Sequence, residues 1–183
     1  MNDRALSFGA DARSYHRFRP GYPESVVDLV LDHADGAVTR ALEVGAGTGK
    51  ATTLFAARGI EVLAIEPDDA MRAVLEEQTR DLPVRPVGAT FETLDVGSAG
   101  QVDLLFAAAA FHWTAPATRW DRAAALLRPG GVAAFFGGFT ELSDRSLSAR
   151  VDALAAEVLE HDTFDLGEGN DRGSLHWPAS DLR

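Results

Sequence analysis

Ala41-Leu42-Glu43-Val44-Gly45-Ala46-Gly47-Thr48-Gly49 is the stretch that decides the fold. It predicts a short buried strand that runs into a glycine-dense turn and then into a helix. Three glycines at alternate positions allow a sharp backbone turn and leave no Cβ to obstruct a ligand. The first N–H groups of the following helix would point at that ligand. Open α/β sheets bind ligands at the carboxyl ends of their strands, so we expect a binding site at this turn.

The composition of the chain fits one globular domain. It has 183 residues, of which 46% are hydrophobic and 25% are charged, a balance that can build a core. The formal net charge is −11, and no basic run offsets it, so we expect no nucleic acid partner. There is no cysteine, which excludes disulfides, a thiol nucleophile and cysteine-ligated zinc.

The sequence carries no signal for export or membrane insertion. Residues 1–4 are polar, and the apolar segment of a signal peptide does not follow them. The longest apolar run, residues 104–111, is too short to span a bilayer. We therefore expect a cytoplasmic protein without a membrane partner.

Strands and helices alternate along the chain. The apolar patterns predict strands over residues 40–44, 61–66, 84–88, 102–107 and 132–136. They predict helices that begin near residues 23, 50, 68, 116 and 146. The continuous apolar run at 102–107 is typical of a parallel strand buried on both faces, and Pro86 favours an edge position for the third strand. The alternation predicts an α/β sandwich of three layers, with helices on both faces of a mostly parallel sheet.

We expect a single domain with three parts: an N-terminal arm over 1–22, a core over 23–160 and an irregular tail over 161–183. Residues 15–23 have no helix pattern but are rich in aromatic and arginine side chains. Such an arm either lies over a binding site or packs on the domain for stability. The sequence leaves both interpretations open.

The spacing around the glycine turn separates three kinds of binding site. A phosphate loop would need glycine at Val44 and serine or threonine at Ala51, so it is excluded. A dinucleotide fingerprint would need a third glycine at Lys50, where this chain has a bulky side chain instead. The dinucleotide interpretation is therefore disfavoured.

Residues 43–49 closely resemble the first motif of class I S-adenosylmethionine-dependent methyltransferases, which is acidic-x-Gly-x-Gly-x-Gly. Further segments resemble other parts of this family in the right order, namely residues 15–23, 87–92, 103–113 and 126–131. The His-Trp pair at 112–113 is similar to the small-molecule, type 11-like branch. The resemblance implies a Rossmann-like fold with strand order 3-2-1-4-5 and methyl transfer from S-adenosyl-L-methionine to a small-molecule acceptor.

The resemblance also implies which residues bind the cofactor. Glu66 follows Glu43 by 23 positions and stands where the family has its ribose-binding carboxylate, a group that can accept hydrogen bonds from both ribose hydroxyls. Glu43 would act near the methionine end, and Thr90 stands where the family usually has an adenine-binding Asp. The expected cofactor-binding residues are Tyr15, Arg19, Glu43, Gly45, Ala46, Gly47, Glu66, Pro67, Thr90, Phe91 and Ala107.

His112 is the candidate catalytic residue, because a histidine near the expected methyl group has a suitable pKa for a general base. The alternative is a structural pair with Trp113. No cluster has metal-ligand spacing, so we expect no metal. Since the donor supplies an activated methyl group, we expect catalysis mainly by proximity and orientation.

The chain departs from the family at its end. The family sheet has seven strands, and the last two are not recognisable before Arg183. The fifth strand would then have an unpaired apolar edge. The chain is either a fragment, an oligomer that covers this edge, or a domain whose tail covers it. A catalytically silent cofactor-binding or scaffold domain is an alternative function, and a nicotinamide oxidoreductase is a weaker one.

Overall fold

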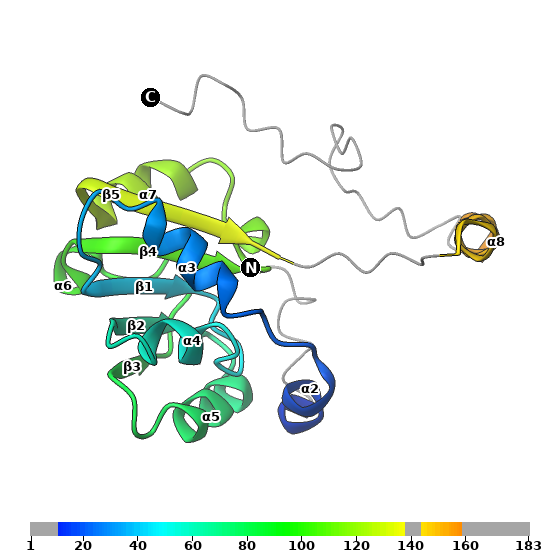
Figure 1. Ribbon diagram of the computed structural model, residues 1–183, viewed down its shortest axis with the longest axis horizontal. Helices are drawn as coiled ribbons and strands as arrows, with labels where there is room; N and C mark the ends of the chain where they lie inside the picture. Colours follow the sequence, from blue (N-terminus) through cyan, green and yellow to red (C-terminus); the bar gives the residue numbers. More distant parts are fainter. Residues whose placement is uncertain (1–10, 138–143, 159–183) are drawn as a thin grey trace. The chain divides into compact units, whose positions relative to one another are not determined.

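The computed structural model describes residues 11–137 and 144–158. They fall in two separate units, divided after Gly138, and each unit is described by itself. In the first unit a five-stranded sheet lies between helices (Figure 1). Its strands are β1 (Arg40–Val44), β2 (Glu61–Ile65), β3 (Val84–Val87), β4 (Val102–Ala108) and β5 (Leu127–Phe136). Its helices are α2 (Ala12–Phe18), α3 (Ser25–Asp32), α4 (Thr52–Ala56), α5 (Asp69–Gln78), α6 (Val96–Ala99), the 3₁₀ helix η2 (Phe111–Trp113) and α7 (Arg119–Leu126). The second unit contains α8 (Arg145–Val158).

The strand order is β3-β2-β1-β4-β5, and all four neighbouring pairs are parallel. This confirms the predicted fold class and strand order. β3 lies at one edge, as Pro86 indicated, because proline has no N–H to donate to a further strand. β1 lies at the centre, with Leu42 opposite Leu63 of β2 and Leu105 of β4.

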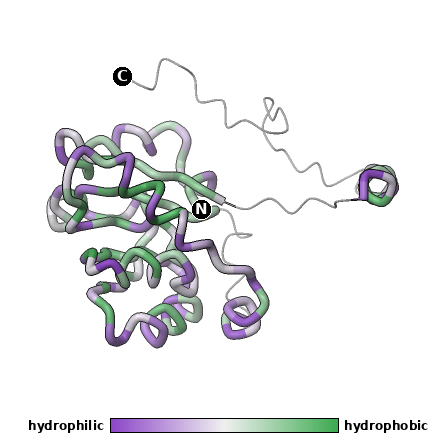
Figure 2. The backbone as a smooth tube through the Cα atoms, in the orientation of Figure 1, coloured by the Kyte–Doolittle hydropathy of each residue, from purple (hydrophilic) through white to green (hydrophobic). Residues whose placement is uncertain are grey.

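Alternating side chains of the strands form a core on each face of the sheet. On one face Leu42 packs with residues of α6 and α7, and on the other Ala41 packs with residues of α3, α4 and α5. The rings of Phe55 and Phe106 stack at 4.2 Å between centroids in the second core. Figure 2 shows the hydrophobic colour following the strands between the helical layers. This two-sided burial explains why β1 and β4 are almost continuously apolar.

The arm contains a helix, so the interpretation of residues 15–23 as wholly non-helical is wrong. α2 covers Ala12–Phe18, and the side chain of Asp11 caps it by accepting a 3.1 Å hydrogen bond from the Ser14 N–H. Ala12 and Tyr15 pack against Met71 of α5. The helix depends on this tertiary packing, since a seven-residue helix is not stable alone.

The first strand has the predicted bounds, and several other elements have shifted ends. α4 begins at Thr52, two residues after its expected start, and ends at Ala56. β5 begins at Leu127, five residues earlier than predicted. The expected tail at 161–183 and residues 1–10 of the arm lie outside the described residues. Within the described ranges β5 pairs only with β4, so oligomerisation through its outer edge stays a prediction.

None of the described helices has both the length and the apolar character that crossing a bilayer requires.

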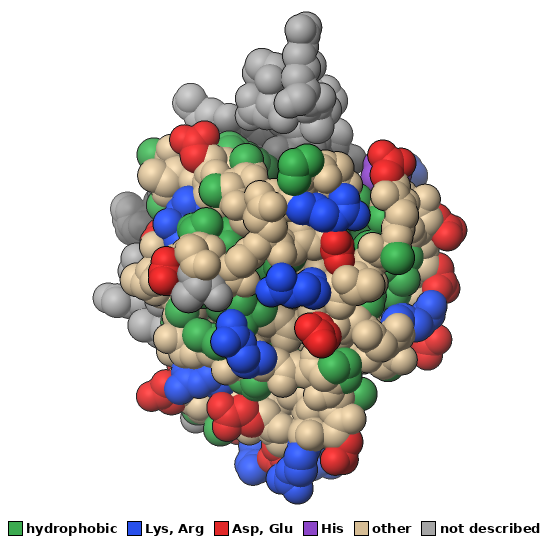
Figure 3. Space-filling view, turned by 90° about the vertical axis from the view of Figure 1, so that its left-hand side faces the viewer, with side chains coloured by type: hydrophobic (Ala, Val, Ile, Leu, Met, Phe, Trp, Pro, Cys, Tyr) green, Lys and Arg blue, Asp and Glu red, His purple; other side chains and the backbone are tan. Residues whose placement is uncertain are grey.

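Asp103 ties three strands together at the amino edge of the sheet, which Figure 3 views face on. Its Oδ2 accepts hydrogen bonds from the Thr39 N–H (2.8 Å), the Thr39 hydroxyl (2.9 Å) and the Arg40 N–H (2.9 Å). Its Oδ1 accepts a 2.6 Å hydrogen bond from Arg128 Nε. Burial alone would raise the pKa of Asp103, but the bonds from Arg128, Thr39 and Arg40 outweigh it and hold the pKa far below its usual range.

We expect Asp103→Asn to lower the free energy of unfolding by about 1–3 kcal/mol at pH 7, the scale of lost hydrogen bonds to a charged group. Because the folded-state pKa is depressed, the carboxylate stabilises the fold above the ordinary pKa of Asp. The difference between wild type and variant should therefore shrink as the pH falls below about 4. Urea denaturation at several pH values measures both effects.

The control is Asp81→Asn, which changes an exposed aspartate in the turn after α5. Equal stability of the Asp103 and Asp81 variants would contradict the role assigned to Asp103.

Candidate functional site

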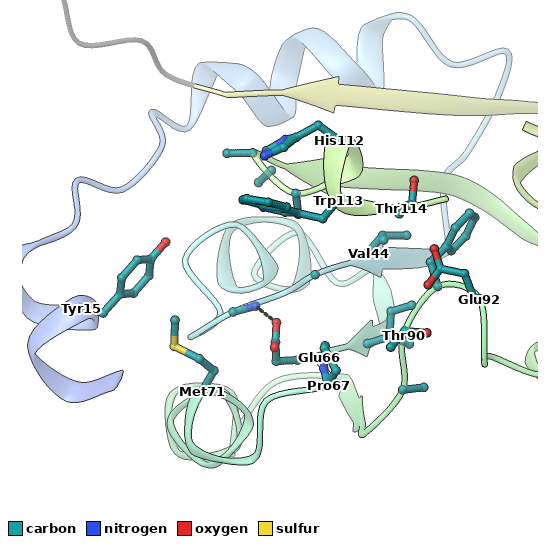
Figure 4. A pocket seen from close by; sticks show the side chains of 18 of the residues that line it. Tyr15, Val44, Glu66, Pro67, Met71, Thr90, Glu92, His112, Trp113 and Thr114 are labelled. Atoms are coloured by element: carbon teal, nitrogen blue, oxygen red, sulfur yellow. Dashed lines mark hydrogen bonds between the residues drawn. The ribbon is translucent and has the colours of Figure 1, made fainter. Parts of the chain in front are cut away.

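A pocket of about 290 Å³ lies at the carboxyl ends of β1, β2 and β4 (Figure 4). Its walls come from the glycine turn, the segments that follow β2, β3 and β4, and the arm. In Figure 4, Trp113 lies on one side of the pocket, and Met71 and Glu66 lie on the opposite side. Chain topology thus brings five separate segments to one place, as expected for an open parallel sheet.

The glycine turn closes the base of the pocket. Gly45, Gly47 and Gly49 have φ values of +68°, +57° and +87°, in the left-handed region that favours glycine. A Cβ on Gly45 would lie 2.6 Å from the Cβ of Ala110, so the turn and the segment after β4 are in close contact. The turn needs glycine at position 45 for conformation and for space.

The sequence predicts that free N–H groups of the helix after the turn would point at the ligand, and the structure differs. α4 begins only at Thr52, and the N–H of Gly47 is already bound to Glu66. The structure therefore offers a carboxylate beside the turn rather than a row of free helix N–H groups. This arrangement suits a ligand that donates hydrogen bonds better than it suits a phosphate.

Glu66 is held rigidly in the pocket. Its Oε2 accepts a 2.8 Å hydrogen bond from the Gly47 N–H, and its Oε1 accepts a 2.9 Å bond from the Asp68 N–H. Burial raises its pKa, although these two bonds oppose the shift. Since each carboxylate oxygen can accept a second hydrogen bond, Glu66 retains capacity for two hydroxyl groups of a ligand.

Glu43 is buried behind the turn, with 1% of its surface exposed. The hydroxyl of Thr52 donates a 2.5 Å hydrogen bond to its Oε2. Burial raises the pKa of Glu43 to about 8, Thr52 opposes the shift, and the nearby charge of Glu66 adds to it. The carboxyl group is therefore mostly neutral at pH 7. It lines a smaller hollow of about 40 Å³ beneath the arm, together with Arg19 and Lys50.

The arm forms one wall of the pocket, which favours the interpretation that it lies over a site. Tyr15 and Arg19 line both the pocket and the smaller hollow. The Arg19 guanidinium lies 6.0 Å from the centroid of the Tyr15 ring, a cation–π arrangement. The hydroxyl of Thr48 in the turn lies 2.9 Å from Nδ1 of His16.

The segment after β3 forms the wall on the far side from the arm. The Thr90 hydroxyl accepts a 3.1 Å hydrogen bond from the Thr93 N–H, which fixes a tight turn. Phe91 is 3% exposed and lines the pocket. Glu92 also lines the pocket and accepts a 2.8 Å hydrogen bond from the Ala115 N–H, so it connects this segment to the one after β4.

The segment after β4 brings His112 and Trp113 to the pocket, with their ring centroids 4.7 Å apart. Burial, with a smaller contribution from the charge of Arg119, lowers the pKa of His112. The imidazole is therefore neutral at pH 7 and able to accept a proton. Its tilted contact with the Trp113 ring is equally what a structural pair would show, so the catalytic role stays a prediction.

Ala109 has φ +55°, a left-handed value that is unfavourable for a residue with a Cβ. Its N–H donates a 2.7 Å hydrogen bond to the Phe136 carbonyl, which holds the backbone in this state. The consequence is that Ala108, Ala109 and Ala110 all line the pocket. Backbone strain of this kind is concentrated at functional sites.

The structure brings most of the predicted site residues together. The pocket is lined by Tyr15, Arg19, Gly45, Gly47, Glu66, Pro67, Thr90, Phe91 and His112. Glu43 and Ala46 line the smaller hollow. Ala107 lies in the hydrophobic core with 1% exposure, and the next three residues line the pocket in its place. The pocket also contains residues that were not among the expected cofactor-binding or catalytic residues, including Met71, Glu92 and Trp113.

Within the two described ranges, no three histidine or carboxylate side chains are grouped closely enough to hold a metal ion.

Comparison with known proteins gives a consistent family. The model of the methyltransferase domain family matches residues 42–135, just over half of the chain. An uncharacterised methyltransferase from Mycobacterium tuberculosis is 38% identical over 133 residues, which cover 70% of this chain and 51% of that protein. The chain spans about half the length of the curated relatives it matches.

Two solved structures extend the comparison to three dimensions. A type II methyltransferase from Anaeromyxobacter dehalogenans has a TM-score of 0.61 and 32% identity, over 79% of this chain and 60% of that one. CalS10 from Micromonospora echinaspora, an amino pentose methyltransferase with bound S-adenosylmethionine, has a TM-score of 0.56 and 25% identity. That match covers 69% of this chain and 55% of CalS10.

We expect Ala109→Gly to raise the free energy of unfolding by about 1 kcal/mol, because glycine adopts the left-handed backbone without strain. The matched control is Ala108→Gly, in the adjoining strand residue, which should lower stability by about 0.5–1 kcal/mol. Urea denaturation distinguishes the two variants. Destabilisation by both would contradict the strain at Ala109.

We expect Glu43 to make the fold less stable as the pH rises. Its folded-state pKa of about 8 exceeds the ordinary value of 4.5, so the folded protein retains a proton that the unfolded chain has lost. The free energy of unfolding should fall by up to about 1.4 kcal/mol per pH unit between pH 5 and 8. Glu43→Gln keeps an acceptor for the Thr52 hydroxyl but cannot ionise, so its pH profile should lack this fall.

Glu61→Gln, at an exposed position on β2, serves as the control in the same titration. Parallel profiles of wild type and Glu43→Gln would contradict a raised folded-state pKa of Glu43.

Proposed function

Because the chain belongs to the methyltransferase domain family, with S-adenosylmethionine as its cofactor, we propose that it transfers a methyl group from this donor to a small-molecule acceptor. The observation that carries the proposal is the Glu66 carboxylate. It is fixed by the Gly47 N–H inside the pocket and retains acceptor capacity for two hydroxyl groups. A ribose offers two neighbouring hydroxyl donors to such a group.

The remaining walls suit the other parts of the donor. Met71 and Phe91 offer apolar surface for the adenine ring, and Thr90 lines the same pocket. At the arm end, Arg19 and Glu43 line the same hollow. Arg19 would suit the carboxylate of the methionine part, and Glu43 would suit its ammonium group. A site with buried carboxyl groups and one nearby arginine complements a donor that carries two positive charges and one negative charge.

The chain would act mainly by binding, orientation and exclusion of water. S-adenosylmethionine, when bound, supplies the activated methyl group. The arm and the segment after β4 both enclose the site, which favours a fixed approach of the acceptor. Neutral His112 would take a proton at a ring nitrogen from an acceptor that must lose one.

Three observations support a small acceptor rather than a nucleic acid. The net charge of −11 repels phosphate backbones. The arm restricts the pocket to about 290 Å³, a size suited to small ligands. CalS10, at 25% identity, acts on an amino pentose. A cytoplasmic location fits these features and stays a prediction.

We expect Glu66→Gln to weaken binding of S-adenosylmethionine by about 10- to 100-fold, because a charged acceptor for the ribose is replaced by a neutral amide. Isothermal titration calorimetry of the full chain measures this directly. The control is Glu61→Gln at the first residue of β2, at the far end of the strand that Glu66 follows, and this variant should bind normally.

Unchanged affinity of a folded Glu66→Gln protein would remove Glu66 from the donor site. Tight binding of NAD without binding of S-adenosylmethionine would overturn the proposed activity. Donor binding without turnover on any acceptor would favour a catalytically silent cofactor-binding domain instead.

A further inference from the structure

His16 connects the arm to the glycine turn across 32 residues of sequence. Its Nδ1 lies 2.9 Å from the hydroxyl of Thr48, a hydrogen bond that is partly shielded from solvent. Thr48 is 2% exposed and stands between Gly47 and Gly49. This hydrogen bond therefore joins the arm to the glycine turn, whose N–H groups form the base of the pocket together with the Glu66 carboxylate.

α2 also packs on α5, and this packing by itself leaves the position of the helix over the turn less defined. Ala12 packs with Met71 and Val74 of α5. The Arg13–Glu77 ion pair is 3.0 Å long, but 78% of the arginine side chain is exposed, so it adds little. Packing of one short helix on another allows sliding and rotation, which a directional hydrogen bond to the turn would restrict.

His16 lies between two residues of the arm that line the pocket, so holding His16 in place also affects their positions. Tyr15 precedes it by one residue and Arg19 follows it by three, and both line the pocket. His16 itself does not line the pocket. Fixing His16 against Thr48 therefore fixes where Tyr15 and Arg19 stand relative to Glu66.

We propose that the His16–Thr48 hydrogen bond positions the arm for donor binding, so that affinity for the donor depends on a pair of side chains that do not act on its reacting atoms. His16 is a positioning residue on this proposal. The inference rests on the proposed function, because the donor provides one of its two measurements.

The charge state of the ring determines the choice of variants. Burial, followed by the charge of Lys50, lowers the pKa of His16, and Glu77 opposes the shift. The ring is thus neutral at pH 7 and has one donor and one acceptor nitrogen. Asparagine places a neutral amide at a similar distance from the backbone as Nδ1, so His16→Asn should keep the hydrogen bond that His16→Ala removes.

The first experiment is a double-mutant cycle on binding of S-adenosylhomocysteine, measured by calorimetry at pH 7. His16→Ala and Thr48→Val should each weaken binding by about fivefold to tenfold, the equivalent of one hydrogen bond. The double variant should be no weaker than either single variant, because both remove the same bond. His16→Asn should bind within about twofold of wild type, and His33→Ala, an exposed histidine after α3, should have no effect.

The second experiment needs no ligand. Trypsin cleaves after Arg13 and Arg17 of α2 when this helix opens, whereas the bond after Arg19 resists trypsin because Pro20 follows it. His16→Ala and Thr48→Val should therefore be cut after Arg13 and Arg17 faster than wild type, His16→Asn and His33→Ala. Equal cleavage rates of all these proteins would overturn the positioning role of His16. A double variant whose loss of affinity is the product of the two single losses would also overturn it. Failure of wild type to bind S-adenosylhomocysteine would instead contradict the proposed function. The cleavage comparison would still show whether the His16–Thr48 hydrogen bond holds the arm in place.

Discussion

The fold and the site both depend on the left-handed backbone of the glycine turn. Gly45 can approach Ala110 only because it lacks a Cβ, and the N–H groups of Gly45 and Ala46 both donate to the carbonyl of Ile65 at 3.0 Å. The N–H of Gly47 is left for Glu66. One turn thereby joins the ends of β1, β2 and β4, so the geometry of the sheet is transmitted directly to the walls of the pocket. The arm then adds a fourth contact through Thr48.

Charge gives the site its chemical character. Burying a carboxyl group without a cation is costly, yet Glu43 and Glu66 are both buried near the turn. Each has hydrogen-bond donors, and each has a raised pKa. A cationic ligand would lower the cost of ionising them, whereas an anionic phosphate would increase it. The electrostatics of the pocket thus favour the donor class that the family uses.

The sequence predicts the strands from local pattern, and its resemblance to the methyltransferase family implies their order and the place of Glu66 at the end of β2, where parallel strands of such sheets bind ligands. It does not predict α2, whose weak pattern is overridden by packing of Ala12 and Tyr15 on α5. The contact of His16 with Thr48 was equally inaccessible, since it depends on how the arm docks. Trp113 and Glu92 lie in segments that were recognised, but the direction of a side chain in a loop depends on backbone angles such as that of Ala109.

The two edges of the sheet affect stability in opposite directions. At the carboxyl edge the chain holds Ala109 in an unfavourable conformation and buries two carboxyl groups, each of which costs free energy. At the amino edge Asp103 joins the starts of β1, β4 and β5 through charge-assisted hydrogen bonds. β4 connects the two edges, since Asp103 and Ala108 lie near its opposite ends. The strained backbone at Ala109 can persist because Asp103 anchors the same strand at its far end. The residues that stabilise this domain are therefore separate from those that would bind its donor.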